Sequence, residues 1–334
     1  MSKISGFRIL VTGGAGFIGS HLTDYLLSQG NEVTVIDNLV NGKMQNLNEA
    51  QKSDKFKFVE ADILSLADCE PAFKNIDFVF HLACLGVRHS LHSPFENHRV
   101  NAEGTLNMLE AAKRNNIKHF FYISTSEIYG RTTSFPIDEN SATIPLTVYG
   151  SSKLVGEHYS HSYRECFGLN STVLRIFNNY GPRAHYEGDA GEVIPRSIVH
   201  IINNEQPIIF GKGDITRDFF YVKDTAAALT SLIPLRDELN GVTINIGTGV
   251  EISMRVLIEQ LLAVMGKKDL GIKFLPDRPA DVPRLWVNNA KFKGMVGFKS
   301  QYSFQDGLTE TVNFYKKLSE KKNLLSEVKE TNWK

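Results

Sequence analysis

A glycine-rich turn between a strand-like run and a helix-like run constrains the fold of this chain more than any other feature. Phe7–Thr12 is a short apolar run that leads directly into Gly13-Gly14-Ala15-Gly16-Phe17-Ile18-Gly19. Leu22, Leu26 and Leu27 then follow helical spacing. Glycines in such a unit let the backbone approach a pyrophosphate, whose charge the amides at the helix N-terminus stabilise. The pattern predicts a dinucleotide-binding unit, with cofactor contacts at Gly13, Gly16, Phe17, Ile18 and Gly19.

The end of the next strand distinguishes between the two nicotinamide dinucleotides. Glu32–Ile36 is rich in β-branched residues and leads into Asp37, eighteen residues after Gly19. A carboxylate at this place accepts hydrogen bonds from the adenosine ribose and repels a 2′-phosphate. We therefore predict that the cofactor is NAD rather than NADP.

The same alternation of strand and helix continues along the first half of the chain. The strand-like runs are Phe56–Glu60, Asp77–Leu82 and His119–Ser124, and the helical patterns are Leu64–Lys74 and Phe95–Asn115. Alternation of this kind predicts an α/β fold of the Rossmann class, a doubly wound parallel sheet covered by helices. Asp62 and Ala83 follow the third and fourth strands, where a dinucleotide would cross the sheet edge; turn formation explains both residues as well.

Beyond Arg175 the alternation becomes less regular. Pro182, Pro195 and Pro207 interrupt it. We predict an NAD-binding domain in residues 1–180, and in residues 181–334 a smaller α/β domain that mainly binds substrate, part of its chain crossing back to the first sheet.

Composition excludes several classes of partner. Lys plus Arg equals Asp plus Glu at 37 each, so the chain has no net positive field to attract nucleic acid or anionic lipid. No apolar run approaches the roughly 18 residues of a membrane-spanning helix. The three cysteines have no Cys-x-x-Cys spacing, and the histidines lack a ligand pattern, so we predict neither a disulfide framework nor a metal site. A reducing, cytoplasmic location fits this composition.

Tyr149-Gly150-Ser151-Ser152-Lys153 is the main candidate for catalytic chemistry. On a helix Tyr149 and Lys153 are i,i+4 neighbours, so the ammonium favours the ionised phenol and makes Tyr149 a candidate base. If a strand ends at Ile123, the polar residues from Ser124 to Glu127 lie at its carboxyl end, where ligands bind in open α/β sheets. Taken alone, Tyr-x-x-x-Lys describes an ordinary surface pair equally well.

Further stretches complete a series of motifs along the chain. Besides the glycine turn and the Tyr149–Lys153 pair, the series contains Asp37-Asn38, His81-Leu82-Ala83, Asn101, Arg175-Ile176-Phe177-Asn178, Tyr180-Gly181-Pro182-Arg183, Arg217-Asp218-Phe219 and Arg278-Pro279-Ala280-Asp281-Val282. Together they resemble the extended short-chain dehydrogenase/reductases that modify nucleotide sugars, from about residue 7 to about residue 320.

The resemblance implies a set of binding residues, with NAD as cofactor, a nucleotide-diphosphate sugar as partner and a homodimer built from helix pairs. The implied cofactor contacts, besides those of the glycine turn, are Asp37, Asn38, Asp62, Ile63, Leu82, Ala83, Asn101, Ser124, Tyr149, Lys153 and Phe177. The implied substrate contacts are Ser126, Asn178, Val193, Phe210, Arg217, Arg278 and Asp281. Glu192 departs from the pattern, because several relatives have asparagine there, and this puts that substrate contact in doubt.

The resemblance also implies a shared first step and several continuations. Tyr149, its pKa lowered by Lys153, takes the proton of the sugar 4-hydroxyl, which Thr125 or Ser124 hydrogen-bonds, while hydride passes to NAD⁺ and leaves a 4-keto sugar. Glu127 resembles the carboxylate that removes the acidified hydrogen at carbon 5 in 4,6-dehydratases, although Ser126 replaces the aspartate of the deoxythymidine-diphosphate-glucose enzymes. The predicted catalytic residues are therefore Thr125, Glu127, Tyr149 and Lys153.

We predict a nucleotide-hexose 4,6-dehydratase. The alternatives are a 4-epimerase, whose resemblance extends over the chain after Gly181, and a nucleotide-glucuronate decarboxylase, for which the segment before Tyr149 lacks the usual arginine. Outside enzymes, the fold alone also fits a cofactor-binding protein without turnover.

Overall fold

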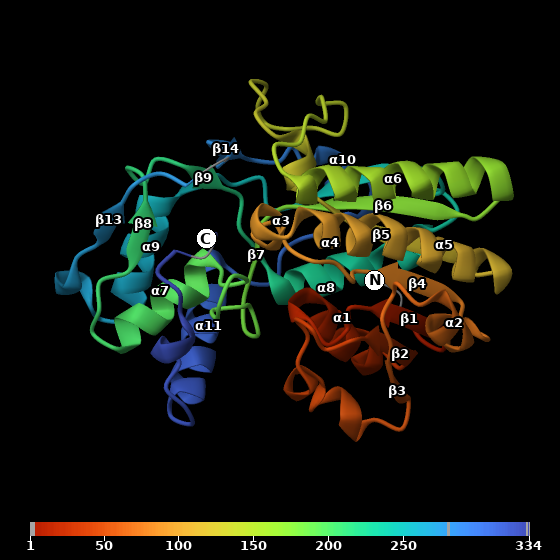
Figure 1. Cartoon of the computed structure of the whole chain (residues 1–334), viewed down its shortest axis with the longest axis horizontal. Helices are drawn as coiled ribbons and strands as arrows, with labels where there is room; N and C mark the ends of the chain where they lie inside the picture. The colour runs from red at the N-terminus through yellow and green to blue at the C-terminus, as the bar shows by residue number, and fades with distance from the viewer. Residues whose placement is uncertain (1–3, 279–280, 332, 334) are drawn as a thin grey trace.

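The computed structural model describes residues 4–278, 281–331 and 333, and it confirms the predicted α/β class (Figure 1). Its centre is a seven-stranded sheet in the order β11-β6-β5-β4-β1-β2-β3, in which every pairing is parallel. The strands are β1 (Arg8–Thr12), β2 (Glu32–Asp37), β3 (Phe56–Glu60), β4 (Phe78–His81), β5 (His119–Thr125), β6 (Ser171–Ile176) and β11 (Thr243–Ile246). The order reverses between β1 and β4, and open α/β sheets bind ligands at such a reversal.

Both faces of the sheet are buried because helices cover them (Figure 1). Ile9 and Val11 pack on one side in the same apolar cluster as α1 (Phe17–Ser28) and α8 (Val222–Ser231), whereas Leu10 packs on the other side with α5 (Gly104–Arg114). Helix α6 (Val148–Phe167) lies on this second side and contacts both β5 and α5. This alternation is the period of two that a buried strand requires.

The second half of the chain builds a smaller body beside the carboxyl ends of the strands (Figure 1). Its apolar cluster joins α7 (Val193–Ile202), α9 (Met254–Val264) and α11 (Phe304–Ser319). Short strands accompany them: β8 (Ile208–Phe210) pairs with β13 (Lys273–Leu275), β9 (Thr216–Arg217) pairs with β12 (Ile252–Ser253) and β14 (Arg284–Leu285), and β7 (Asn179–Tyr180) pairs with β10 (Phe220–Tyr221). Strand β11 and the helix α10 (Ala290–Val296) return to the large sheet. The division at residue 180 stays a prediction.

Local chemistry explains where the predicted helices differ from the observed ones. The pattern at 64–74 forms only α2 (Leu66–Cys69) and a 3₁₀ turn (Glu70–Phe73), because Pro71 lacks the amide that a longer helix needs. The pattern at 95–115 is divided into α4 (Pro94–His98), a π-helical turn (Arg99–Glu103) and α5, and α3 (His89–His92) precedes them. None of the helices within the described ranges has the length and apolar character needed to cross a bilayer.

Candidate active site

A cavity of about 1030 Å³ lies at the carboxyl ends of the strands, between the large sheet and the smaller body. Almost every residue predicted for cofactor or substrate lines it: Gly13, Gly16, Phe17, Ile18, Gly19, Asp37, Asn38, Asp62, Ile63, Leu82, Ala83, Ser124, Thr125, Ser126, Glu127, Tyr149, Lys153, Phe177, Asn178, Val193, Arg217, Arg278 and Asp281. Such a volume is at the upper end of the range for small-molecule sites, so it has room for an extended ligand or for two ligands.

The glycine turn has no space for side chains. Gly13 has a φ of +70°, and a Cβ on it would lie 2.8 Å from the backbone of Ala83. A Cβ on Gly19 would collide with the carbonyl oxygen of Gly13. Helix α1 begins at Phe17, and no side chain caps its first amides. Phe17, Ile18 and Gly19 line the cavity, so this uncapped helix start suits an anion there.

Asp37 lies at the end of β2 with its carboxylate held in place. The carboxylate accepts hydrogen bonds from the amides of Ala15 at 3.0 Å and Leu39 at 2.9 Å. Burial raises the pKa of Asp37, and these two hydrogen bonds oppose the rise. Beside it, the Asn38 amide donates to the Asp62 carboxylate at 3.0 Å, so this edge of the cavity is polar and preorganised.

Thr125 and Tyr149 meet where β5 ends and α6 begins. The Thr125 hydroxyl accepts a hydrogen bond from the Glu127 amide at 3.2 Å, which starts the turn after β5. Helix α6 begins at Val148 because the Thr147 hydroxyl accepts from the Gly150 amide at 3.1 Å. This capping sets Tyr149 in the first turn of the helix, with its phenol hydrogen-bonded to the Thr125 side chain.

The prediction that Lys153 lowers the pKa of Tyr149 is wrong for the protein without a bound ligand. Burial raises the pKa of the phenol well above its usual value, and the neighbouring Cys84 and Glu127 side chains raise this pKa further. The hydrogen bond with Thr125 acts in the opposite direction but is the weaker effect. The phenolate therefore needs more positive charge than Lys153 alone supplies.

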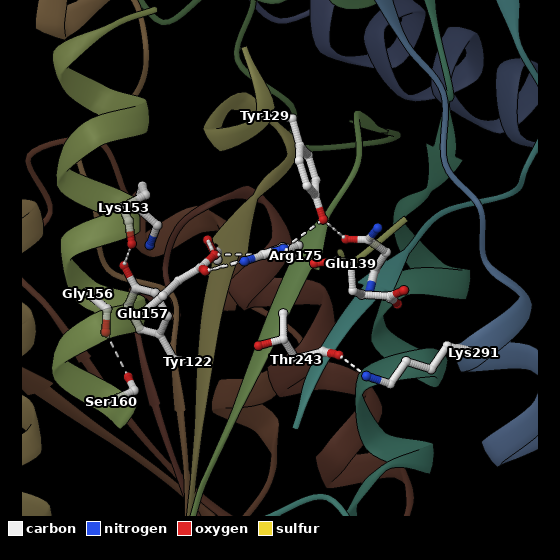
Figure 2. A network of polar contacts seen from close by, with 12 residues as sticks. Tyr122, Tyr129, Glu139, Lys153, Gly156, Glu157, Ser160, Arg175, Thr243 and Lys291 are labelled. Atoms are coloured by element: carbon white, nitrogen blue, oxygen red, sulfur yellow. Dashed lines mark hydrogen bonds and ion pairs between the residues drawn. The ribbon is translucent and has the colours of Figure 1, made fainter. Parts of the chain in front are cut away.

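Lys153 is buried one helical turn after Tyr149, with its Nζ 4.5 Å from the centroid of the Tyr122 ring. Burial lowers the pKa of this ammonium. The Tyr122 hydroxyl donates to the backbone carbonyl of Lys153 at 3.0 Å, which ties α6 to β5 at the level of the site (Figure 2).

A buried network that the sequence did not reveal supports the same region (Figure 2). Glu157 accepts hydrogen bonds from the Ser124 hydroxyl at 2.5 Å and from the Arg175 guanidinium at 2.8 Å. Arg175 also donates to the Tyr129 hydroxyl at 2.8 Å. Glu157 lies four residues after Lys153, just as Lys153 lies four residues after Tyr149. This repeated spacing was the one sign in the sequence that Glu157 lies on the same face of the helix.

Two carboxyl groups in the cavity resist ionisation. Burial raises the pKa of Glu127, although the arginines 217, 88 and 278 oppose the rise. Burial raises the pKa of Glu192 to about 7. Glu192 is therefore able to give and accept protons near neutral pH, and Glu127 holds its proton more tightly than an exposed carboxyl does.

The two arginines predicted to bind the diphosphate share one carboxylate partner. Arg217 and Arg278 both contact the Asp281 carboxylate, at 2.7 and 3.0 Å. Pro279 and Ala280, the middle of that motif, lie outside the described residues. Nearby, the Asn178 side-chain oxygen is buried and, among the described residues, has no hydrogen-bond partner.

Two predicted contacts do not line the main cavity. Asn101 is buried behind it and binds the backbone of Leu85. Phe210 borders a small adjoining cavity of about 30 Å³, where its ring lies 5.4 Å from the Arg278 guanidinium. Arg88, which had not been singled out in the sequence, does line the main cavity.

Comparison with known proteins identifies the family. A family model described as GDP-mannose 4,6 dehydratase matches residues 10–311. The chain belongs to the extended short-chain dehydrogenase/reductases of the nucleotide-sugar epimerase/dehydratase family. This epimerase/dehydratase is 34% identical to the UDP-glucose 4-epimerase of Mycolicibacterium smegmatis (strain ATCC 700084 / mc(2)155), over 94% of this chain and 100% of that protein.

Two solved structures have the same fold as this epimerase/dehydratase. One is the UDP-glucuronic acid 4-epimerase from Bacillus cereus in complex with UDP-glucuronic acid and NAD, with a TM-score of 0.87, 33% identity, and coverage of 93% of this chain and 99% of that one. The other is the dTDP-glucose 4,6-dehydratase from Streptomyces venezuelae with NAD bound, with a TM-score of 0.89, 28% identity, and coverage of 95% and 99%. Relatives named as UDP-glucuronic acid decarboxylases also match, so membership in the family fixes the enzyme class and leaves the subtype open.

Proposed function

We propose that this enzyme is an NAD-dependent nucleotide-hexose 4,6-dehydratase. The observation that carries the proposal is Glu127, a carboxyl group with a raised pKa in the same cavity as Tyr149. Epimerisation at carbon 4 has no step that needs such a group, whereas elimination across carbons 5 and 6 needs one base and one acid. A single carboxyl whose pKa is raised by burial fits both tasks.

The cavity fits NAD. The Gly13 and Gly19 positions exclude a side chain, and the uncapped start of α1 lines the same cavity, which is the arrangement that a pyrophosphate requires. The preorganised Asp37 carboxylate suits a ribose with free hydroxyls. When bound, NAD supplies the reversible removal and return of a hydride at the sugar.

The residues of the chain would act in the following order. Tyr149, with Thr125 beside it, takes the proton from the 4-hydroxyl as carbon 4 becomes a ketone. Glu127 then removes the acidified proton at carbon 5 and gives a proton to the 6-hydroxyl, which leaves as water. Loss of water leaves a double bond between carbons 5 and 6. The hydride taken from carbon 4 would return to carbon 6 and a proton to carbon 5, which gives a 4-keto-6-deoxy sugar with no net change of oxidation state. Lys153 and the Ser124–Glu157 contact hold this surface in place.

The test of the proposal is product analysis with nucleotide sugars. Purified protein is incubated with UDP-glucose, GDP-mannose and dTDP-glucose, and the products are measured by mass spectrometry. A product lighter by one water, with the absorbance that keto sugars develop in alkali, supports dehydration. A product of unchanged mass contradicts it, and an inert protein that still binds NAD supports the class without turnover.

A 4-epimerase is the second candidate, because an epimerase is among the relatives above 30% identity that span the whole chain. A decarboxylase is less well supported, since it would release carbon dioxide from a glucuronate and the segment before Tyr149 lacks the arginine of that group. Product mass separates all three reactions.

We further propose a homodimer in the cytoplasm. Phe95 of α4 is 87% exposed, and the exposed Leu91 and Val148 lie on α3 and α6, which contact each other. An apolar surface on adjoining helices fits a helix-pair interface. Sedimentation of the wild type and of Phe95→Glu tests this, because the substitution should release monomers.

A further inference from the structure

Arg88 occupies the main cavity because the loop before it is anchored from behind. The Leu85 amide donates to the Asn101 side chain at 2.8 Å, and the Asn97 amide donates to the Leu85 and Gly86 carbonyls at 3.1 and 3.0 Å. Asn97 and Asn101 are both buried. The loop is therefore fixed on the side away from the cavity, and Arg88 lies on the cavity wall.

The Arg88 guanidinium is a cation of the cavity wall that is not held by another side chain among the described residues. Within the described ranges it makes no hydrogen bond and no ion pair, whereas Arg217 and Arg278 both contact Asp281. Burial, with the nearby Arg278 cation, lowers the pKa of Arg88 to about 10, so the side chain is still charged at neutral pH. The residue is half-buried, and an anion that accepts two parallel hydrogen bonds satisfies such a guanidinium best.

Positive charge exceeds negative charge around Arg88. Its charged neighbours include Arg278, Glu192, Arg196 and Asp281, and Glu127 also interacts with it. Asp281 is shared between Arg217 and Arg278. Glu192 carries less negative charge than an exposed glutamate, because its pKa is raised. This group of side chains can therefore take additional negative charge, which is what a diphosphate brings.

We propose that Arg88 binds the diphosphate of the nucleotide-sugar substrate, next to Arg278. The assignment rests on the proposed function only in that the substrate is a nucleotide sugar; it holds for a dehydratase and an epimerase alike. A carboxylate on the sugar offers the same bidentate chemistry. The diphosphate is favoured because Arg278, a predicted diphosphate contact, is the cation that acts most strongly on Arg88.

Calorimetric titration separates these sources. Wild type, Arg88→Gln and Arg88→Lys are titrated with UDP, GDP and dTDP, with the matching nucleosides, and with UDP-glucose and UDP-glucuronate. Arg99→Gln is the matched control, since Arg99 is exposed and pairs with Glu103. Arg88→Gln should weaken the tightest-binding diphosphate about 10- to 100-fold and leave its nucleoside unchanged, as the loss of a charge-assisted bidentate contact requires. Arg88→Lys should recover part of the loss.

Three results would overturn the assignment. If Arg88→Gln leaves the affinity for every diphosphate unchanged and weakens only the binding of UDP-glucuronate, Arg88 binds a carboxylate on the sugar. No change with any probe would remove it from the site. An equal loss for nucleoside and diphosphate in both variants would mean that Arg88 only supports the fold. Product analysis of the wild type is independent of these titrations, so a failed dehydratase assay would leave the result for Arg88 standing.

Discussion

Glu192→Gln should make the protein more stable at alkaline pH, because burial of the Glu192 side chain makes ionising it unfavourable. Burial raises its pKa from 4.5 to about 7, so the folded state binds a proton more tightly than the unfolded chain does. Stability from this group is therefore fully present below pH 4.5 and is lost as the pH rises through about 7. The shift corresponds to a loss of at most about 3 kcal/mol at pH 8 and of less than about 1 kcal/mol at pH 5.

The measurement is urea unfolding of wild type and Glu192→Gln at pH 5 and pH 8, followed by circular dichroism. The amide cannot ionise, so the variant should gain up to about 3 kcal/mol over wild type at pH 8 and little at pH 5. Glu187→Gln, in the same loop, is the control with the opposite sign. Hydrogen bonds and charges from His185 and Lys43 hold the pKa of Glu187 below its usual value, so this variant should lose stability at pH 8.

A stability difference between Glu192→Gln and wild type that is the same at both pH values would refute the reasoning. It would mean that the substitution acts through packing or hydrogen bonding and that the carboxyl of Glu192 titrates alike in the folded and unfolded chains. A loss of stability at pH 8 would go further and indicate an ion pair for Glu192 in the folded protein.

Three more perturbations test other parts of the site. Glu127→Gln should abolish release of water, by about 100-fold or more, while oxidation of the sugar, followed by the absorbance of the reduced nicotinamide, continues; equal loss of both would exclude the carboxyl as the group acting at carbon 5. Asp37→Ser should weaken NAD about 10- to 100-fold in a fluorescence titration and improve NADP; unchanged selectivity would separate Asp37 from the ribose. Gly156→Ala should cost about 1–3 kcal/mol in urea unfolding, since its Cβ would overlap the Tyr122 hydroxyl; wild-type stability would show that α6 can move away from β5.

The parts of the site that the sequence predicted are those with a fixed local geometry. The glycine turn, Asp37 at the next strand end and Tyr149 four residues before Lys153 all follow from the period of a helix or from the order of strands in a parallel sheet. The same holds for the strands β1 to β5, whose predicted and observed bounds differ by no more than one residue at either end.

The parts that were missed depend on distances through space. Glu157 meets Ser124 across 33 positions of sequence, because α6 packs on β5. Arg88 depends on two amides that anchor its loop from another segment. The pKa of Tyr149 was predicted in the wrong direction because the sequence shows its neighbour Lys153 but not the burial that outweighs it.

Burial connects the acid–base groups of the cavity with its arginines. The carboxyls of Glu127 and Glu192 are both pushed toward their neutral forms, and the arginines 217, 88 and 278 are what keeps the Glu127 pKa from rising further. A diphosphate bound by those arginines would neutralise that influence and raise the Glu127 pKa. On the proposals above, binding the anionic end of the substrate therefore makes Glu127 a stronger base toward the hydrogen at carbon 5. The positive charge that the cavity holds in excess thus serves recognition at one end of the ligand and proton transfer at the other.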